Sequence, residues 1–187
     1  MSEIDRRTFL KSASALSAMG AMTMLGGAGP VWGQSAAGQE RPDVMRKPIP
    51  STGEEIPAVG MGSWITFNVG NDMELRDQCA DVMSAFFAAG GRMIDSSPMY
   101  GSAQDVIGYG LDKLGARDQV FSTDKIWTAG DGMEQLAETE ARWSLKKFDL
   151  LQVHNLLGIN ENLPLLFKLK DQGLLRYVGV TTSHGRR

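Results

Sequence analysis

Four polar side chains of different chemistry lie at the ends of three apolar segments. Asp95 follows a short apolar run, and Tyr100 lies five residues further on. Lys125 lies near the end of the next apolar segment, and His154 ends the one after it. If these segments are neighbouring parallel strands, all four groups meet at one edge of a sheet. That edge is where barrel enzymes carry their chemistry.

A carboxylate, a phenol, an amine and an imidazole together suit the addition of hydride and a proton to a carbonyl group. A phenol has a pKa of about 10 in water, and a nearby lysine cation is expected to lower it. The carboxylate would keep the lysine charged, and the histidine could donate a hydrogen bond to the oxygen that the phenol protonates. Because no side chain supplies hydride, this interpretation requires a nicotinamide cofactor.

Each residue taken alone also has an ordinary structural explanation. Asp95 could cap a loop, Tyr100 could be a packed ring with a solvated hydroxyl, and His154 could be a structural histidine. Lys125 is harder to explain, since burying a lysine is costly unless it is paired. Asp95 is the natural partner. The four residues at one predicted edge therefore favour a catalytic set.

The elements that would position this set follow a repeating pattern. We expect strands over residues 58–64, 92–97, 120–126, 149–154 and 177–182. Apolar residues at helical spacing predict helices between them, within 75–86, 107–114, 136–148 and 164–172. Short strands that are apolar throughout are typical of parallel sheets with helical crossovers.

The pattern predicts an α/β fold, a partial (β/α)8 TIM barrel with five strands and four helices. A hairpin over residues 48–57, with its turn at 51–53, would close the bottom of the barrel. A doubly wound sheet is the alternative, and it calls for Gly-x-Gly-x-x-Gly after the first strand. Gly60-Met61-Gly62 lacks the third glycine. The hairpin and the strand-end chemistry favour the barrel.

The motifs around these residues resemble those of the aldo-keto reductase family. The resemblance runs from about residue 45 to residue 187 and rests on segments 95–102, 121–127, 148–155 and 176–181. It implies that Asp95, Tyr100, Lys125 and His154 are a catalytic tetrad. It also implies NADP(H) as the cofactor and a small aldehyde or ketone as the substrate, with Tyr100 as the general acid.

The same resemblance implies a set of binding residues. The cofactor positions are Gly62, Ser63, Trp64, Thr181 and Thr182, and the substrate positions are Trp64, Trp127 and Asn155. The two threonines depart from the family, which usually has Ser-Asn there to hold the nicotinamide carboxamide. Gln104 stands where many members have glutamate.

The family's barrel has eight strands, and this sequence ends after the fifth. We therefore expect a fragment or truncated product, with a dimerising half barrel as the alternative. A chain that ended at Arg187 would lack the loops that grip the cofactor's phosphates in the family. A non-enzymatic truncated fragment is thus the alternative function. A third hypothesis is a different barrel enzyme that uses Lys125 as a Schiff-base amine.

The N-terminal segment predicts export. Arg6-Arg7 is followed by Phe9, Leu10 and Lys11 and then by a weakly apolar stretch rich in small residues. This order is typical of a twin-arginine signal. The stretch over residues 12–29 is too short and too small in side chain for a convincing membrane span.

We predict a signal peptide over residues 1–37, a linker over 38–46 and the barrel over 47–187. Signal cleavage is expected near residues 31–33 or 35–37. The partner would be the twin-arginine export machinery, the location the periplasm, and no stable membrane anchor is expected. The segment resembles the signals of the twin-arginine pathway, which carries folded proteins, often with a cofactor already bound.

Composition excludes several classes of function. The net charge of the 187 residues is −3, which offers no broad basic surface for nucleic acid. Cys79 is the single cysteine, so an internal disulfide and a cysteine metal cluster are excluded. We predict no metal site.

Overall fold

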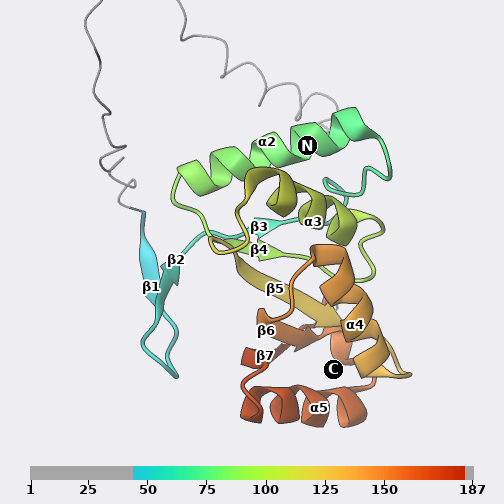
Figure 1. Ribbon diagram of the computed structural model, residues 1–187. Coiled ribbons are helices and arrows are strands. Elements are labelled where there is room, and N and C mark those ends of the chain that lie inside the picture. Colours follow the sequence, from blue (N-terminus) through green and yellow to red (C-terminus); the bar gives the residue numbers. More distant parts are fainter. Residues whose placement is uncertain (1–43, 184–187) are drawn as a thin grey trace, which may run out of the picture.

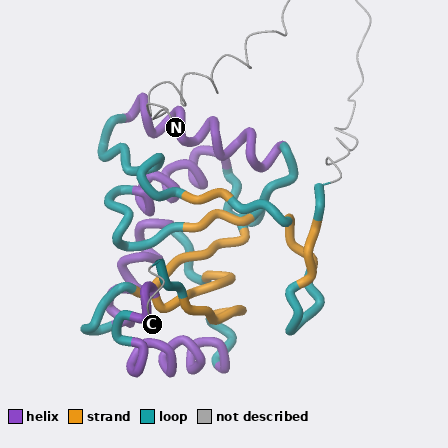
Figure 2. The backbone as a smooth tube through the Cα atoms, turned by 180° about the vertical axis from the view of Figure 1, so that it is seen from behind, coloured by secondary structure: helices purple, strands orange, loops and turns teal. Residues whose placement is uncertain are grey.

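A computed structural model describes residues 44–183 of the chain. It contains a parallel sheet of five strands and a separate two-stranded hairpin. The helices lie together on one side of the strands, and the hairpin lies apart from them on the other side (Figures 1 and 2). The predicted signal peptide and most of the predicted linker lie outside the described residues, as do residues 184–187.

The strands of the sheet follow one another in chain order. They are β3 (Met61–Gly62), β4 (Met93–Asp95), β5 (Phe121–Ile126), β6 (Phe148–Val153) and β7 (Leu175–Val180). Each strand pairs in parallel with the next one along the chain. A doubly wound sheet would reverse its strand order. The prediction of an α/β partial barrel with five strands is therefore confirmed.

Four helices connect these strands and cover the sheet. They are α2 (Met73–Ala88), α3 (Ala103–Leu114), α4 (Gly132–Trp143) and α5 (Ile159–Asp171), and a 3-10 turn, η1 (His154–Leu156), follows β6. Aspartates open two of the helices, because Asp72 accepts from the backbone of Leu75 and Asp131 from that of Met133. Among the described residues no helix has the length and apolar character needed to span a membrane.

The hairpin lies near the beginning of β7, away from the strand ends that carry the predicted chemistry. It pairs β1 (Arg46–Pro48) with β2 (Glu55–Pro57) in antiparallel fashion. Arg176, in β7, forms ion pairs with Glu54 and Asp149. The Tyr177 hydroxyl donates to Glu54 at 2.6 Å. Bonds from Arg176 and Tyr177 lower the pKa of Glu54, which keeps this anchor charged.

Several predicted element boundaries were wrong. The first strand is reduced to Met61–Gly62. Helix α4 ends at Trp143, because Ser144 takes a left-handed conformation and Phe148 already belongs to β6. Helix α5 starts at Ile159, so that Pro164 lies inside it. A proline usually marks a helix start, and here the preceding turn is held by Asn162, which donates to the carbonyls of Thr128 and Leu157.

Helices α3 and α4 approach each other closely at Gly108. A Cβ atom added there would lie 1.9 Å from the backbone oxygen of Arg142. Backbone cannot move aside as a flexible side chain can. The residue following Arg142, Trp143, is fully buried and packs edge-on against Phe148. The absence of a side chain at Gly108 thus sets how α4 packs in the core.

We expect Gly108→Ala to destabilise the fold by roughly 2–3 kcal/mol, since overpacking a close contact forces backbone shifts. Thermal or urea unfolding of the variant and the wild type would measure the difference. Gly62→Ala is the matched control, because a Cβ there has no atom within 4 Å. Equal stability of the Gly108 variant and the control would contradict the proposed close contact.

Candidate active site

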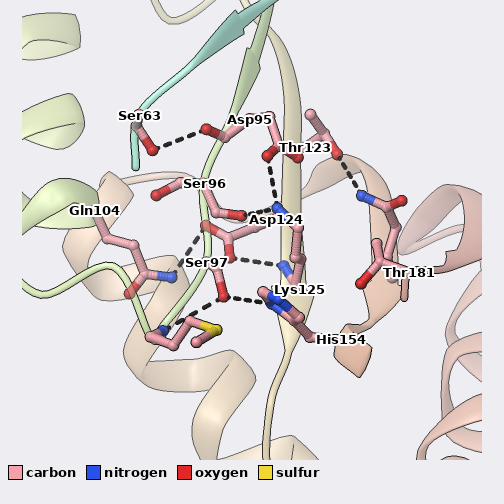
Figure 3. A network of polar contacts seen from close by, with 12 residues as sticks. Ser63, Asp95, Ser96, Ser97, Gln104, Thr123, Asp124, Lys125, His154 and Thr181 are labelled. Atoms are coloured by element: carbon pink, nitrogen blue, oxygen red, sulfur yellow. Dashed lines mark hydrogen bonds and ion pairs between the residues drawn. The ribbon is translucent and has the colours of Figure 1, made fainter. Parts of the chain in front are cut away.

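Lys125 is the centre of the site and is almost fully buried. All six residues of β5 are buried, and Lys125 is 4% exposed. Its Nζ atom donates to Asp95 Oδ2 at 2.6 Å and to the Ser96 carbonyl oxygen at 2.6 Å (Figure 3). Asp95 is Lys125's expected partner, and the ion pair fixes the position of the buried amine.

Tyr100 lies against this lysine. The Lys125 Nζ atom is 5.1 Å from the centre of the Tyr100 ring, which permits a cation–π contact. The His154 ring packs edge-on against Tyr100, with 6.0 Å between ring centres. Tyr100 thus lies against both Lys125 and His154, and the fourth predicted catalytic group, Asp95, is paired with the lysine.

A short turn brings Tyr100 back to the strand ends. The Tyr100 backbone N–H donates to the carbonyl of Ser97 at 3.0 Å. Gly101 then takes a φ of +63°, and a Cβ there would lie 2.4 Å from Asn68 Oδ1. Glycine is therefore required at this position both for its backbone conformation and for the space.

The pKa of Tyr100 is raised, not lowered as the sequence suggested. Burial is the main cause, followed by the negative charges of Asp95 and Asp124. The nearby Lys125 does not reverse this rise, because its Nζ atom donates to Asp95 and to the Ser96 carbonyl. A neutral phenol at physiological pH is the form that can donate a proton.

His154 is buried and neutral near pH 7. It lies in η1, directly after β6, where the sequence placed the last residue of a strand. Burial and the nearby Lys125 lower its pKa, and Asp95 opposes them. Its Nδ1 atom lies 2.8 Å from Ser97 Oγ. An uncharged imidazole with one nitrogen engaged can donate a hydrogen bond from the other.

The predicted cofactor loop lies beside the tetrad. Gly62 pairs with Asp95 in the sheet register. Ser63 is buried, and its hydroxyl donates to the Asp95 carbonyl at 2.8 Å. Trp64 is 63% exposed, and its ring centre is 6.5 Å from that of Tyr100. This loop therefore supports the end of β4 through Ser63 and presents an open aromatic face through Trp64.

Two other predicted binding residues tie β6 to β7. The Asn155 backbone N–H donates to Thr181 Oγ1 at 3.1 Å, and Asn155 Oδ1 accepts from Ser183 at 3.0 Å. Thr181 also donates its backbone N–H to Val153. Thr182 is exposed beyond this link. Asn155 and Thr181 therefore already have structural partners.

Trp127 is exposed just after β5, with 39% of its surface accessible. Its backbone is fixed by Gln135, which accepts from the Trp127 N–H at 2.6 Å and donates to its carbonyl at 3.2 Å. The indole is thus held at the end of the lysine strand with part of its surface free. Its role in substrate binding stays a prediction.

Asp124 was missed in the sequence, although it is fully buried beside Lys125. It accepts hydrogen bonds from Gln104 Nε2 at 3.0 Å, from Trp143 Nε1 at 2.7 Å and from the Lys125 backbone at 2.7 Å. Burial raises its pKa to about 6, and these donors and the charge of Lys125 oppose the rise. An aspartate within an apolar strand was the available signal.

Ser96 and Ser97 were also missed as individual residues. Both are fully buried. Ser97 contacts His154, whereas the Ser96 hydroxyl has no hydrogen-bond partner among residues 44–183. The same part of the chain contains no group of three or more histidine, cysteine or acidic residues arranged to hold a metal ion.

The chain belongs to the Aldo/keto reductase family, whose model matches residues 58–186. It is 30% identical over 148 residues to methylglyoxal reductase YeaE of Escherichia coli K12, covering 74% of this chain and 50% of that protein. It is 28% identical over 148 residues to L-galactose dehydrogenase of Arabidopsis thaliana, covering 70% of this chain and 46% of that protein. The resemblance inferred from the sequence is confirmed.

Solved structures of the family share this fold. An aldo/keto reductase from Klebsiella pneumoniae, in complex with NADP and acetate, has 26% identity and a TM-score of 0.60. The match covers 71% of this chain and 48% of that one. The thermostable aldo-keto reductase Tm1743, bound to epalrestat, also has 26% identity and a TM-score of 0.60. The chain spans about half the length of the curated relatives it matches.

We expect Asp124 to make stability fall as pH rises from about 4 to about 6. Its pKa moves from 3.8 to about 6 on folding, so the folded state binds more protons in that window. Between these pH values the free energy of unfolding of the wild type should fall by on the order of 2–3 kcal/mol relative to that of Asp124→Asn, since one pKa unit corresponds to about 1.4 kcal/mol. Urea unfolding at pH 4, 5, 6 and 7 measures this difference.

Asp112→Asn is the control for removing one carboxylate, because Asp112 forms an exposed ion pair with Arg117. The stability difference between Asp124→Asn and the wild type should change with pH far more than the corresponding difference for Asp112→Asn. A pH-independent difference at Asp124 would show that its carboxyl has the same pKa in both states.

Proposed function

We propose that the chain carries the catalytic centre of an NADP(H)-dependent reductase that converts a small aldehyde or ketone to an alcohol. The observation that carries the proposal is the convergence of Tyr100, Lys125 and His154, with the lysine held by Asp95. Membership of the Aldo/keto reductase family supports the same reaction class.

The residues at the strand ends fit a nicotinamide. Trp64 offers an exposed ring face 6.5 Å from Tyr100, and Gly62 has open space where a side chain would be. Thr182 is exposed after β7 and carries a hydroxyl and a backbone N–H that suit a carboxamide. Gly62, Ser63, Trp64, Thr181 and Thr182 would border the ring. When bound, the reduced cofactor supplies the hydride.

The chain's own residues would handle the proton and the carbonyl oxygen. Tyr100 is neutral and donates its hydroxyl proton to the oxygen as negative charge develops there. Lys125, a fixed cation beneath the Tyr100 ring, then stabilises the phenolate that forms. His154 donates a hydrogen bond to the same oxygen. The ion pair with Asp95 keeps Lys125 in place throughout.

The substrate would lie among Trp64, Trp127 and Asn155. The two tryptophans are partly exposed at the ends of β3 and β5 and provide apolar walls. Asn155 is held by Thr181 and Ser183, so it would contribute to shape more than to new hydrogen bonds. A small, compact carbonyl compound fits this description, and the similarity to a methylglyoxal reductase supports that class.

Tyr100→Phe is expected to slow carbonyl reduction by about 10²–10⁴-fold, because it removes the general acid and keeps the ring. The rate is measured as the decrease in NADPH absorbance with methylglyoxal as the probe substrate. Cofactor affinity, measured by fluorescence titration with NADPH, should change little, since the ring against Trp64 remains.

Tyr109→Phe is the matched control, because this tyrosine is half-buried in α3 and its hydroxyl donates to Asp77, outside the proposed site. It should leave the rate unchanged. Equal rates for Tyr100→Phe and the wild type would refute the assignment of the acid. Failure of the 187-residue chain to bind NADPH saturably would refute the reductase function of this chain.

We further propose that the protein is exported in its folded form to the periplasm by the twin-arginine machinery. The support is the order Arg6-Arg7, Phe9-Leu10, Lys11 and a small-residue stretch that follows. Folded export allows NADP(H) to be bound in the cytoplasm before transport. The signal peptide over residues 1–37 would be removed afterwards.

Changing Arg6 and Arg7 together to lysine should abolish export while preserving charge. Fractionation of bacterial cells, with detection of a C-terminal tag, would show the protein moving from the periplasm to the cytoplasm. Lys11→Arg is the control and should leave export intact. Periplasmic protein from the double variant would contradict the twin-arginine route.

A further inference from the structure

Ser97 and His154 form a buried pair beneath the site. Ser97 Oγ and His154 Nδ1 are 2.8 Å apart, with 0% of Ser97 and 5% of His154 exposed (Figure 3). The proposed reaction needs His154 to donate a hydrogen bond. Whether it can do so depends on which ring nitrogen carries the proton, and Ser97 contacts one of them.

The surroundings of Ser97 settle the direction of this hydrogen bond. Its oxygen already accepts from the backbone N–H of Met99 at 3.4 Å, a local turn typical of serine. The hydroxyl has a single hydrogen to donate. Within residues 44–183 the only acceptor in reach of that hydrogen is His154 Nδ1. Ser97 therefore donates, and Nδ1 is unprotonated.

The opposite tautomer would leave a buried donor unsatisfied. With a proton on Nδ1, the Ser97 hydrogen would have no acceptor, a costly arrangement away from water. Burial and Lys125 also favour a neutral ring, as they lower the pKa of His154. The single ring proton is then on Nε2. That nitrogen has no hydrogen-bond partner in the described part of the chain, so it is available to a ligand.

We propose that Ser97 is a positioning residue that fixes His154 in the Nε2–H tautomer, so that Nε2–H donates to the carbonyl oxygen of the substrate. The catalytic consequence rests on the reductase function proposed above. The Tyr100 ring packs edge-on against the His154 ring, with 6.0 Å between the ring centres, so the histidine lies beside the proposed acid. The serine thus acts through the histidine and does not itself touch the substrate.

Ser96 provides an unusually close control. It is the neighbouring residue, it has the same side chain, and it is equally buried. Its hydroxyl has no partner among the described residues, whereas that of Ser97 contacts His154. Removing either hydroxyl deletes one buried oxygen atom. Only removal of the Ser97 hydroxyl should affect the histidine.

The first test is the tautomer of His154 in the wild-type protein. Long-range ¹H–¹⁵N correlation spectra of the ¹⁵N-labelled full chain distinguish a ring protonated on Nε2 from one protonated on Nδ1. The chain has two histidines, and His154→Gln identifies which signals belong to His154. At pH 8 we expect the Nε2–H pattern. A dominant Nδ1–H pattern would overturn the proposal.

The second test compares variants in the same spectra. Ser97→Ala should lower the ratio of the Nε2–H to the Nδ1–H form by about tenfold, the effect of one lost hydrogen bond. Ser97→Thr keeps the hydroxyl and should restore the wild-type ratio, and Ser96→Ala should leave it unchanged. An unchanged ratio in Ser97→Ala, or an equal change in Ser96→Ala, would overturn the proposal even if the threonine variant fails to fold.

Kinetics separate this proposal from the proposed function. In Ser97→Ala, kcat/KM for methylglyoxal should fall by about tenfold, while the affinity for NADPH stays constant. A changed tautomer ratio with an unchanged kcat/KM would overturn the catalytic part of the proposal. If the wild-type chain shows no turnover at all, the reductase function fails, and the spectra still decide whether Ser97 sets the tautomer.

Discussion

The buried cation of Lys125 is the constraint on which the rest of the site depends. An ammonium group with so little exposure is stable only with a charged partner and well-placed acceptors. Asp95 and the Ser96 carbonyl supply both from the end of β4. The pairing of β4 with β5 brings these groups into reach, so the sheet register and the ion pair support each other. Tyr100 and His154 are then placed around the lysine by the following loop and the next strand.

Burial and the charges in the site together explain why its two proton-bearing groups are neutral. Burial, and after it the negative charges of Asp95 and Asp124, raise the pKa of Tyr100. Burial, and after it the positive charge of Lys125, lower the pKa of His154. The phenol therefore keeps its proton and the imidazole does not gain a second one. The result is two neutral hydrogen-bond donors beside a fixed cation, which can stabilise negative charge that develops on a carbonyl oxygen.

Much of this arrangement could be predicted from the sequence because it depends on periodicity. Alternating apolar strands and amphipathic helices predicted the partial barrel, and parallel strands place Asp95, Lys125 and His154 at one edge. What was missed depends on contacts between distant residues. The partners of Asp124 come from α3 and α4, and no local pattern reveals that Gln104 and Trp143 point toward it. The start of α5 was misplaced because tertiary hydrogen bonds of Asn162 outweigh the usual position of a proline.

The loop between Asp95 and Gly101 shows how one short segment can organise several catalytic groups. The carbonyl of Ser96 accepts from Lys125, the carbonyl of Ser97 accepts from the Tyr100 backbone, and the Ser97 hydroxyl contacts His154. Backbone carbonyls thus help to hold the lysine and the tyrosine, while the side chains of Asp95 and Ser97 contact the lysine and the histidine. Such groups cost little reorganisation during a reaction, because their positions are set by folding. Removal of the Ser97 hydroxyl would delete its contacts with His154 and with the Met99 N–H and leave the carbonyls of Ser96 and Ser97 in place. Ser97 is therefore the residue where positioning and folding can be separated.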